Sequence, residues 1–130
     1  ELSDEKQIYI STGLGGKGEK LRFYVLILAN ELKPFLEYQK KVIEREFPYS
    51  LEKAGCEIER LTIGEKYMEL VFLIPVRADI KQALDKVINE CNQYGNFLSQ
   101  VFTITNVKEL SAEEVEEIIK KNGGNSQASH

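Results

Sequence analysis

The chain has 130 residues, of which 42% are hydrophobic and 29% are charged, and its net charge is -4. This length suits one domain with its own core, and the composition is that of a globular protein. The negative charge gives no general attraction for nucleic-acid phosphates, and no apolar run reaches the roughly 18 to 20 residues of a membrane span. Residues 1–7 lack the basic and apolar regions of a secretory signal. These features predict a single cytoplasmic domain over residues 1–122 and a polar, disordered tail over 123–130.

The first elements predicted are strands. Residues 7–12 (QIYIST) alternate polar and apolar side chains, which indicates a short strand. Residues 21–29 (LRFYVLILA) are mostly apolar at both odd and even positions, which is typical of a strand covered on both faces. A helix is the alternative for this run, because apolar residues also recur there at helical spacing. Pro34 favours the strand, since proline suits the first turn of a helix that follows and disrupts a helix interior.

A helix is predicted next, over about residues 32–47, where apolar positions form a stripe opposite charged ones. We expect Pro48 to end it. A further turn at 51–54 would close at Gly55, a residue that readily takes the left-handed conformation at the end of a helix.

Two strands then form a predicted hairpin, 56–63 (CEIERLTI) and 67–74 (YMELVFLI), joined by Gly64-Glu65-Lys66. In the first strand the apolar residues change from even positions, Cys56 and Ile58, to odd positions, Leu61 and Ile63. This change predicts a β-bulge near Glu59 or Arg60.

The C-terminal part completes the pattern. Residues 80–91 have the cleanest amphipathic spacing in the chain, with Asp79 available as the N-cap. The more polar run 97–107 suits an edge strand. The capping box in residues 111–114 (SAEE) starts a last helix.

This order predicts an α+β fold of ferredoxin-like βαββαβ type, with an antiparallel sheet, an extra C-terminal helix and a possible N-terminal strand. Runs 21–29 and 67–74 would be its central strands. Both parities of the first run are apolar, so the face away from the two core helices needs a cover. The cover could be the C-terminal helix, the N-terminal strand or a second copy of the chain. A homodimer is favoured, because twofold dimers are the commonest assemblies; its predicted interface is Phe23, Tyr24, Val25, Leu26, Ile27 and Leu28.

A glycine-rich loop is the first candidate ligand site. Its residues are Gly13, Gly15, Gly16, Lys17 and Gly18. The Gly-x-Gly-x-x-Gly spacing matches the dinucleotide fingerprint, in which glycines let backbone N–H groups approach a pyrophosphate at a helix N-terminus. A strand, not a helix, is predicted to follow, which argues against phosphate binding.

Catalysis or metal binding by histidine side chains is not expected, because the only histidine is His130 at the end of the polar tail. Glu69 stands out inside an apolar strand, and with Tyr67 it is a candidate buried polar site. The simpler interpretation is an exposed glutamate or an ion pair with Lys66 or Arg60. Two cysteines, Cys56 and Cys91, lie in apolar patterns and are predicted to be buried free thiols. No catalytic residue, metal site or cofactor is predicted.

The order of segments resembles the small single-tyrosine transposases of the HUH class, over about residues 21–121. The matching pieces are FYVLILANELKPF, CEIERLTIGEKYMELVFLIP and VFTITNVKELSAEEVEEIIKK. The resemblance implies a dimeric ferredoxin-like domain that cleaves DNA. Where the family has its metal-binding His pair, however, this chain has Tyr67-Met68-Glu69, and Ile118 or Ile119 falls where the tyrosine nucleophile would be. The resemblance therefore implies a relative of these transposases that has kept the dimeric fold and lost the catalytic activity. PII-like signalling proteins are similar by element order only.

Two functions follow as hypotheses. The first is a non-catalytic, homodimeric binding or regulatory module of transposase-like fold. The alternative is a small nucleotide- or phosphate-binding protein or enzyme that uses the loop at 13–18. Nucleic-acid binding is possible but is not favoured, because the net charge is negative.

Overall fold

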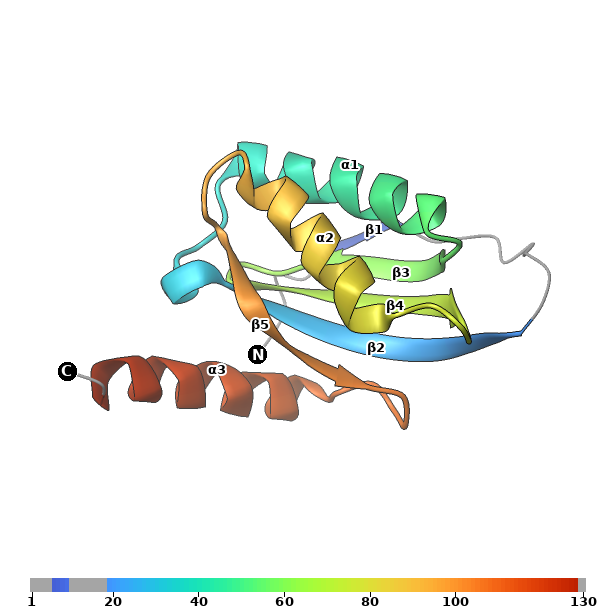
Figure 1. Cartoon of the computed structure of the whole chain (residues 1–130). Helices are drawn as coiled ribbons and strands as arrows, with labels where there is room; N and C mark the ends of the chain where they lie inside the picture. Colours follow the sequence, from blue (N-terminus) through green and yellow to red (C-terminus); the bar gives the residue numbers. More distant parts are fainter. Residues whose placement is uncertain (1–5, 10–18, 129–130) are drawn as a thin grey trace.

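The computed structural model describes the backbone of residues 6–9 and 19–128 and the side chains of residues 19–122. Its strands are β1 (Lys6–Tyr9), β2 (Lys20–Ala29), β3 (Glu57–Ile63), β4 (Tyr67–Pro75) and β5 (Leu98–Thr105). Its helices are η1 (Asn30–Leu32), α1 (Glu37–Lys53), α2 (Ile80–Asn92) and α3 (Ala112–Ala128). One antiparallel sheet has the strand order β1-β3-β4-β2-β5 (Figure 1).

The ferredoxin-like prediction is confirmed. Without β1 and α3, the chain order β2-α1-β3-β4-α2-β5 is the βαββαβ pattern, and β2 and β4 are the central strands. Run 21–29 is a strand, as predicted, and β5 is an edge strand. The N-terminal strand adds to the other edge, beside β3. Residues 10–12, which the sequence also assigned to this strand, lie outside the described residues.

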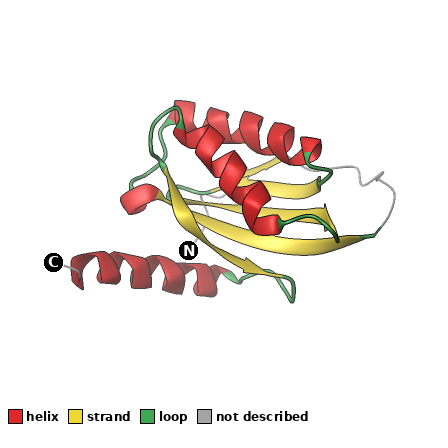
Figure 2. Ribbon diagram, in the orientation of Figure 1, coloured by secondary structure: helices red, strands yellow, loops and turns green. Residues whose placement is uncertain are grey.

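The sheet separates two helix layers, with α1 and α2 on one face and α3 on the other (Figures 1 and 2). Alternate β2 side chains divide between two clusters. Val25 and Ile27 belong to the large core under α1 and α2, whereas Tyr24, Leu26 and Leu28 belong to a smaller cluster with Val115 of α3. We call the sheet side of this smaller cluster the α3 face. The second face of the sheet is thus covered within one chain by the C-terminal helix, one of the three covers that the sequence allows.

The structure contains the predicted bulge in β3 and the predicted glycine cap at the end of α1. The register between β3 and β4 shifts between Ile58 and Arg60, which is the expected bulge. Gly55 has a φ of 90°, its N–H bonds the Glu52 carbonyl, and the Cys56 N–H bonds the Leu51 carbonyl, as in a Schellman C-cap.

The last two helices begin at their predicted caps. The Asp79 carboxylate accepts a hydrogen bond from the Gln82 N–H at 3.1 Å, which caps α2. The Ser111 and Glu114 pair exchanges both bonds of a capping box, at 2.7 and 3.1 Å, and α3 begins directly after Ser111.

Helix α1 departs from the prediction at both ends. Pro48 lies inside the helix, so the prediction that it ends the helix was wrong. Proline in a helix interior costs about 3 kcal/mol. However, Phe47 and Leu51 on either side of it are fully buried, and each such side chain gains about 1.5 to 3 kcal/mol.

The helix also starts later than predicted, at Glu37, after the short η1 turn. Glu31 and Leu32 have φ values of 57° and 55°, and these left-handed residues break the helical path. Pro34 therefore precedes the helix and does not lie in its first turn. At the other end of the chain, α3 continues through residues 123–128, which the sequence assigned to the tail. Glycine lowers helix stability by about 1 kcal/mol per residue without forbidding the conformation.

Both cysteines are buried free thiols, as predicted. Burial raises the pKa of Cys56 to about 11 and that of Cys91 to about 12, so both remain protonated at neutral pH. In the part of the chain that the structure describes, no helix combines the length and apolarity needed to cross a membrane.

Candidate functional site on the α3 face

The two predicted polar residues of β4 lie side by side on the α3 face. Tyr67 and Glu69 are two residues apart on one strand, so their side chains point to the same side of the sheet. They are 3% and 8% exposed. The interpretation of Glu69 as an exposed glutamate is therefore wrong.

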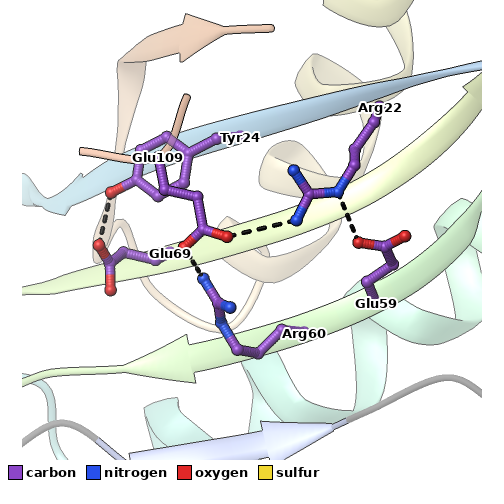
Figure 3. Close-up of polar contacts among 6 residues, drawn as sticks. All are labelled: Arg22, Tyr24, Glu59, Arg60, Glu69 and Glu109. Carbon is purple, nitrogen blue, oxygen red and sulfur yellow. Dashed lines mark hydrogen bonds and ion pairs between the residues drawn. The ribbon is translucent and has the colours of Figure 1, made fainter. Parts of the chain in front are cut away.

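Glu69 accepts a hydrogen bond from the Tyr24 hydroxyl, at 2.5 Å, as Figure 3 shows. Tyr24 lies directly opposite Val71, so Glu69 occupies the diagonal position on the neighbouring strand, within reach of an aromatic side chain. A buried carboxyl group needs such partners, because its transfer from water is costly. The hydrogen-bonded pair therefore stabilises a polar group inside an apolar cluster.

Helix α3 closes over this pair. Val115 is fully buried in the same cluster as Tyr24 and Tyr67, while Ile118 and Ile119 pack against it and remain partly exposed. The structure thus brings together the strand and helix positions that the family resemblance singled out. Val115, Ile118 and Ile119 are the aliphatic side chains that α3 contributes to this cluster.

A group of ion pairs lies next to the buried pair and holds the loop that leads into α3 (Figure 3). Glu109, between β5 and α3, accepts hydrogen bonds from Arg60 of β3 and from Arg22 of β2, the latter at 3.3 Å. Arg22 also donates to Glu59 at 2.7 Å. We call Glu109 and its two arginines the Glu109 clasp. Sequence reasoning missed it and offered Arg60 as a partner of Glu69.

The clasp predicts a pH dependence of stability. The hydrogen bond from Arg60, and secondarily Arg22, holds the pKa of Glu109 below its usual value near 4.5. A lowered folded-state pKa adds stability that is fully present above the unfolded value and is lost as pH falls through the folded one. We expect Glu109→Gln to lower the unfolding free energy by roughly 1 kcal/mol at pH 7.

Urea denaturation from pH 7 to pH 3 tests this. The difference between wild type and Glu109→Gln should stay constant down to about pH 5 and then shrink. The matched control is Glu65→Gln in the exposed β3–β4 turn, where the difference should be small at every pH. A Glu109→Gln effect that does not change with pH would contradict the ionic role.

A second prediction concerns Gly64, at the end of β3. A Cβ atom at this position would lie 2.5 Å from two ring carbons of Tyr67, whose ring is buried. We expect Gly64→Ala to destabilise the protein by about 1 to 3 kcal/mol, because the packed ring has to move. In a Tyr67→Leu background the same change should cost less than half as much when both are measured by urea denaturation. An equal cost in the two backgrounds would show that the ring is not the obstacle.

Other candidate residues are not brought to this site. The loop at 13–18, with Gly13, Gly15, Gly16, Lys17 and Gly18, lies outside the described residues, as does His130. The strand β2 follows that loop, as the sequence predicted, so the helix of a dinucleotide fingerprint is missing there. Among the residues that the structure describes, no three His, Cys, Asp or Glu side chains gather in a way that could hold a metal ion.

Comparison with known proteins supports the fold resemblance. No protein-family model matches the sequence, and no curated protein matches it. Among solved structures, a candidate transposase from Deinococcus radiodurans R1 is similar, with a TM-score of 0.65 and 13% identity over 82% of this chain and 94% of that one. A REP-associated tyrosine transposase bound to a REP hairpin is similar over 82% of this chain and 67% of its own, with a TM-score of 0.58 and 10% identity. The chain therefore has a transposase-like ferredoxin fold.

Proposed function

We propose that this chain is a transposase-like domain without strand-cleaving activity, which works as a binding module. The observation that carries the proposal is the α3 face itself. At the strand positions where the family resemblance places a metal-binding His pair, this chain has a buried tyrosine and a buried glutamate, Tyr67 and Glu69. Val115, Ile118 and Ile119 of helix α3 cover them.

This residue set does not suit cleavage of DNA by a tyrosine nucleophile. That reaction needs a hydroxyl on the helix and a metal held by neutral imidazoles beside the scissile phosphate. Ile118 and Ile119 have no nucleophilic atom. Glu69 is one buried carboxyl group that accepts a hydrogen bond from Tyr24. A phosphate would also need room where Val115 lies fully buried.

Binding of a nucleic acid through the α3 face is not favoured. One solved neighbour, the REP-associated tyrosine transposase, is bound to a REP hairpin. Phosphate contacts would need lysine or arginine side chains without a carboxylate partner. On the α3 face, Lys20 donates to Glu57 at 2.7 Å, Arg22 to Glu59 at 2.7 Å, and Arg60 to Glu109. These glutamates neutralise the cations, so the face offers little charge to a phosphate backbone.

A homodimer is part of the proposal, but its interface is not the sheet face that the sequence indicated. The sequence placed the interface on residues 23–28, but Tyr24, Leu26 and Leu28 are buried by α3 of the same chain. Because α3 covers this face, we propose that the dimer forms through a different surface of the chain. Sedimentation equilibrium of the full chain at micromolar concentrations is expected to give twice the monomer mass, and a monomer at every concentration would contradict the homodimer.

The loss of cleavage is tested with labelled single-stranded hairpin DNA and Mg²⁺ or Mn²⁺. On a denaturing gel we expect neither a cleaved strand nor a covalent protein–DNA product, while the REP-associated tyrosine transposase serves as the active control. Fluorescence anisotropy at physiological salt should give a Kd no tighter than roughly 10⁻⁵ M, the range of non-specific binding. A covalent product would overturn the loss of cleavage. Tight binding that depends on hairpin sequence would overturn the expectation that the chain does not act by binding nucleic acid.

A further inference from the structure

A cavity lies away from the α3 face, at the end of the sheet where β2 leads through η1 into α1. Its volume is about 460 Å³, within the size range of small-ligand sites. Segment 30–39 forms one wall and the turn before β5, residues 95–97, forms the other. None of its lining residues belongs to the cluster under α3 or to the Glu109 clasp.

The lining combines apolar walls with a few polar groups. Pro34, Leu36 and Phe97 are apolar, and the polar side chains include one cation, Lys33. No described lining residue is a carboxylate. The ammonium group of Lys33 lies 3.2 Å from Glu31 outside the lining, but both side chains are more than two-thirds exposed. Such surface pairs contribute only about 0 to 1 kcal/mol, so Lys33 can exchange its partner for a ligand.

Three carboxamides, those of Asn30, Gln39 and Asn96, complete the polar set, and hydrogen bonds hold the first two in place. The Asn30 backbone N–H donates to the Phe97 carbonyl at 2.8 Å, and its side-chain amide donates to the Asn96 carbonyl at 3.1 Å. The Gln39 side-chain oxygen accepts the Leu36 N–H at 2.8 Å. The two walls are therefore tied together without a ligand, which reduces the ordering cost of binding.

A strained backbone turn forms part of the cavity wall. Glu31 and Leu32 are consecutive non-glycine residues with positive φ, a conformation that costs about 1 to 3 kcal/mol per residue. They form the turn that the Lys33 N–H closes onto the Asn30 carbonyl at 3.2 Å. This turn places Asn30 and Lys33 on the same cavity.

We propose that this cavity binds a small organic anion, with an apolar ring or chain against Leu36 and Phe97 and one carboxylate or phosphate group at Lys33. The single cation and the lack of lining carboxylates give the charge preference. The amides of Asn30, Gln39 and Asn96 supply further donors and acceptors for the polar end of the ligand. This proposal stands apart from the proposed function of the α3 face.

Chemical-shift titration of the ¹⁵N-labelled full chain tests the proposal. The probes are benzoate, phenyl phosphate and the neutral analogue benzamide. We expect saturable shifts with the anions in the backbone amides of residues 30, 33, 39 and 95–97, at Kd values of about 1 mM or tighter. The stronger of the two anions identifies the charged group that the site prefers.

The variant Lys33→Gln should weaken anion binding at least tenfold and leave the spectrum otherwise unchanged, because this side chain is exposed. Lys41→Gln, an exposed lysine of α1 outside the lining, should bind as wild type does. Shifts that do not saturate by about 10 mM, benzamide binding as tight as benzoate, or equal losses in both variants would each overturn the proposal.

Discussion

Replacing Val115 with aspartate should release α3 from the sheet while the main core stays folded. Val115 is fully buried in the smaller cluster, and an unpaired charge there costs several kcal/mol. The large core under α1 and α2 is a separate cluster, so detachment of the helix is the cheaper response. Hydrogen exchange should show α3 amides losing protection, with β2 and β4 still protected. Dye binding should rise as the α3 face becomes exposed.

The matched control is Val107→Asp, the same change at a residue that is 84% exposed in the loop before α3. It should shift the unfolding free energy by no more than about 0.5 kcal/mol and leave α3 protected. If Val115→Asp instead unfolded the whole chain in one step, or left α3 protected, the helix would not be a separate cover on the sheet.

The second large effect is expected at the buried pair. Tyr24→Phe keeps the ring and removes the hydroxyl that donates to Glu69. Removing one partner of a buried hydrogen bond costs about 1 to 3 kcal/mol, so urea denaturation should show a loss of about 2 kcal/mol. Glu69→Gln in the same background should give a coupling of at least about 0.5 kcal/mol in a double-mutant cycle.

Tyr38→Phe provides the comparison for this pair. Tyr38 is 48% exposed, and its hydroxyl donates to the Tyr94 carbonyl at 3.1 Å, where water can replace it. We expect a change within about 0.5 kcal/mol. Equal decreases in unfolding free energy for Tyr24→Phe and Tyr38→Phe would mean that burial does not strengthen the Tyr24 hydrogen bond.

Local patterns in the sequence were enough to predict most of the fold. The two-sided apolar runs of β2 and β4 identified the central strands, and the slip of parity in β3 located its bulge. The caps at Asp79 and Ser111 depend on residues three positions apart, so they can be read directly along the chain. Pro48 misled the prediction because the packing of residues on either side outweighs its local cost.

The candidate site could be predicted only in part. A glutamate in an apolar strand was enough to single out Glu69, but its partner Tyr24 lies 45 residues away. The strand register, which places residue 24 diagonally from residue 69, was the available signal. The Glu109 clasp joins residues 49 and 87 positions apart through a loop with no regular pattern. The surplus apolar surface of β2 predicted a cover, but α3 and a second copy can both bury it.

These elements build the transposase-like fold, and they are the basis for the proposal that the chain lacks the chemistry of a transposase. The helix that would carry a nucleophile presents Val115 to the sheet, and Tyr24 and Glu69 occupy the polar space beneath it. The clasp of Glu109 fixes the entry of that helix.

The most direct test is an isotope-filtered NOE experiment on a mixture of labelled and unlabelled full chains. The account predicts NOEs from the Val115 methyl groups to the Tyr24 or Tyr67 ring of the same chain, because α3 covers its own sheet face. Val115 methyl groups that show NOEs only within α3 would contradict the account, since the positions on β4 would then be open.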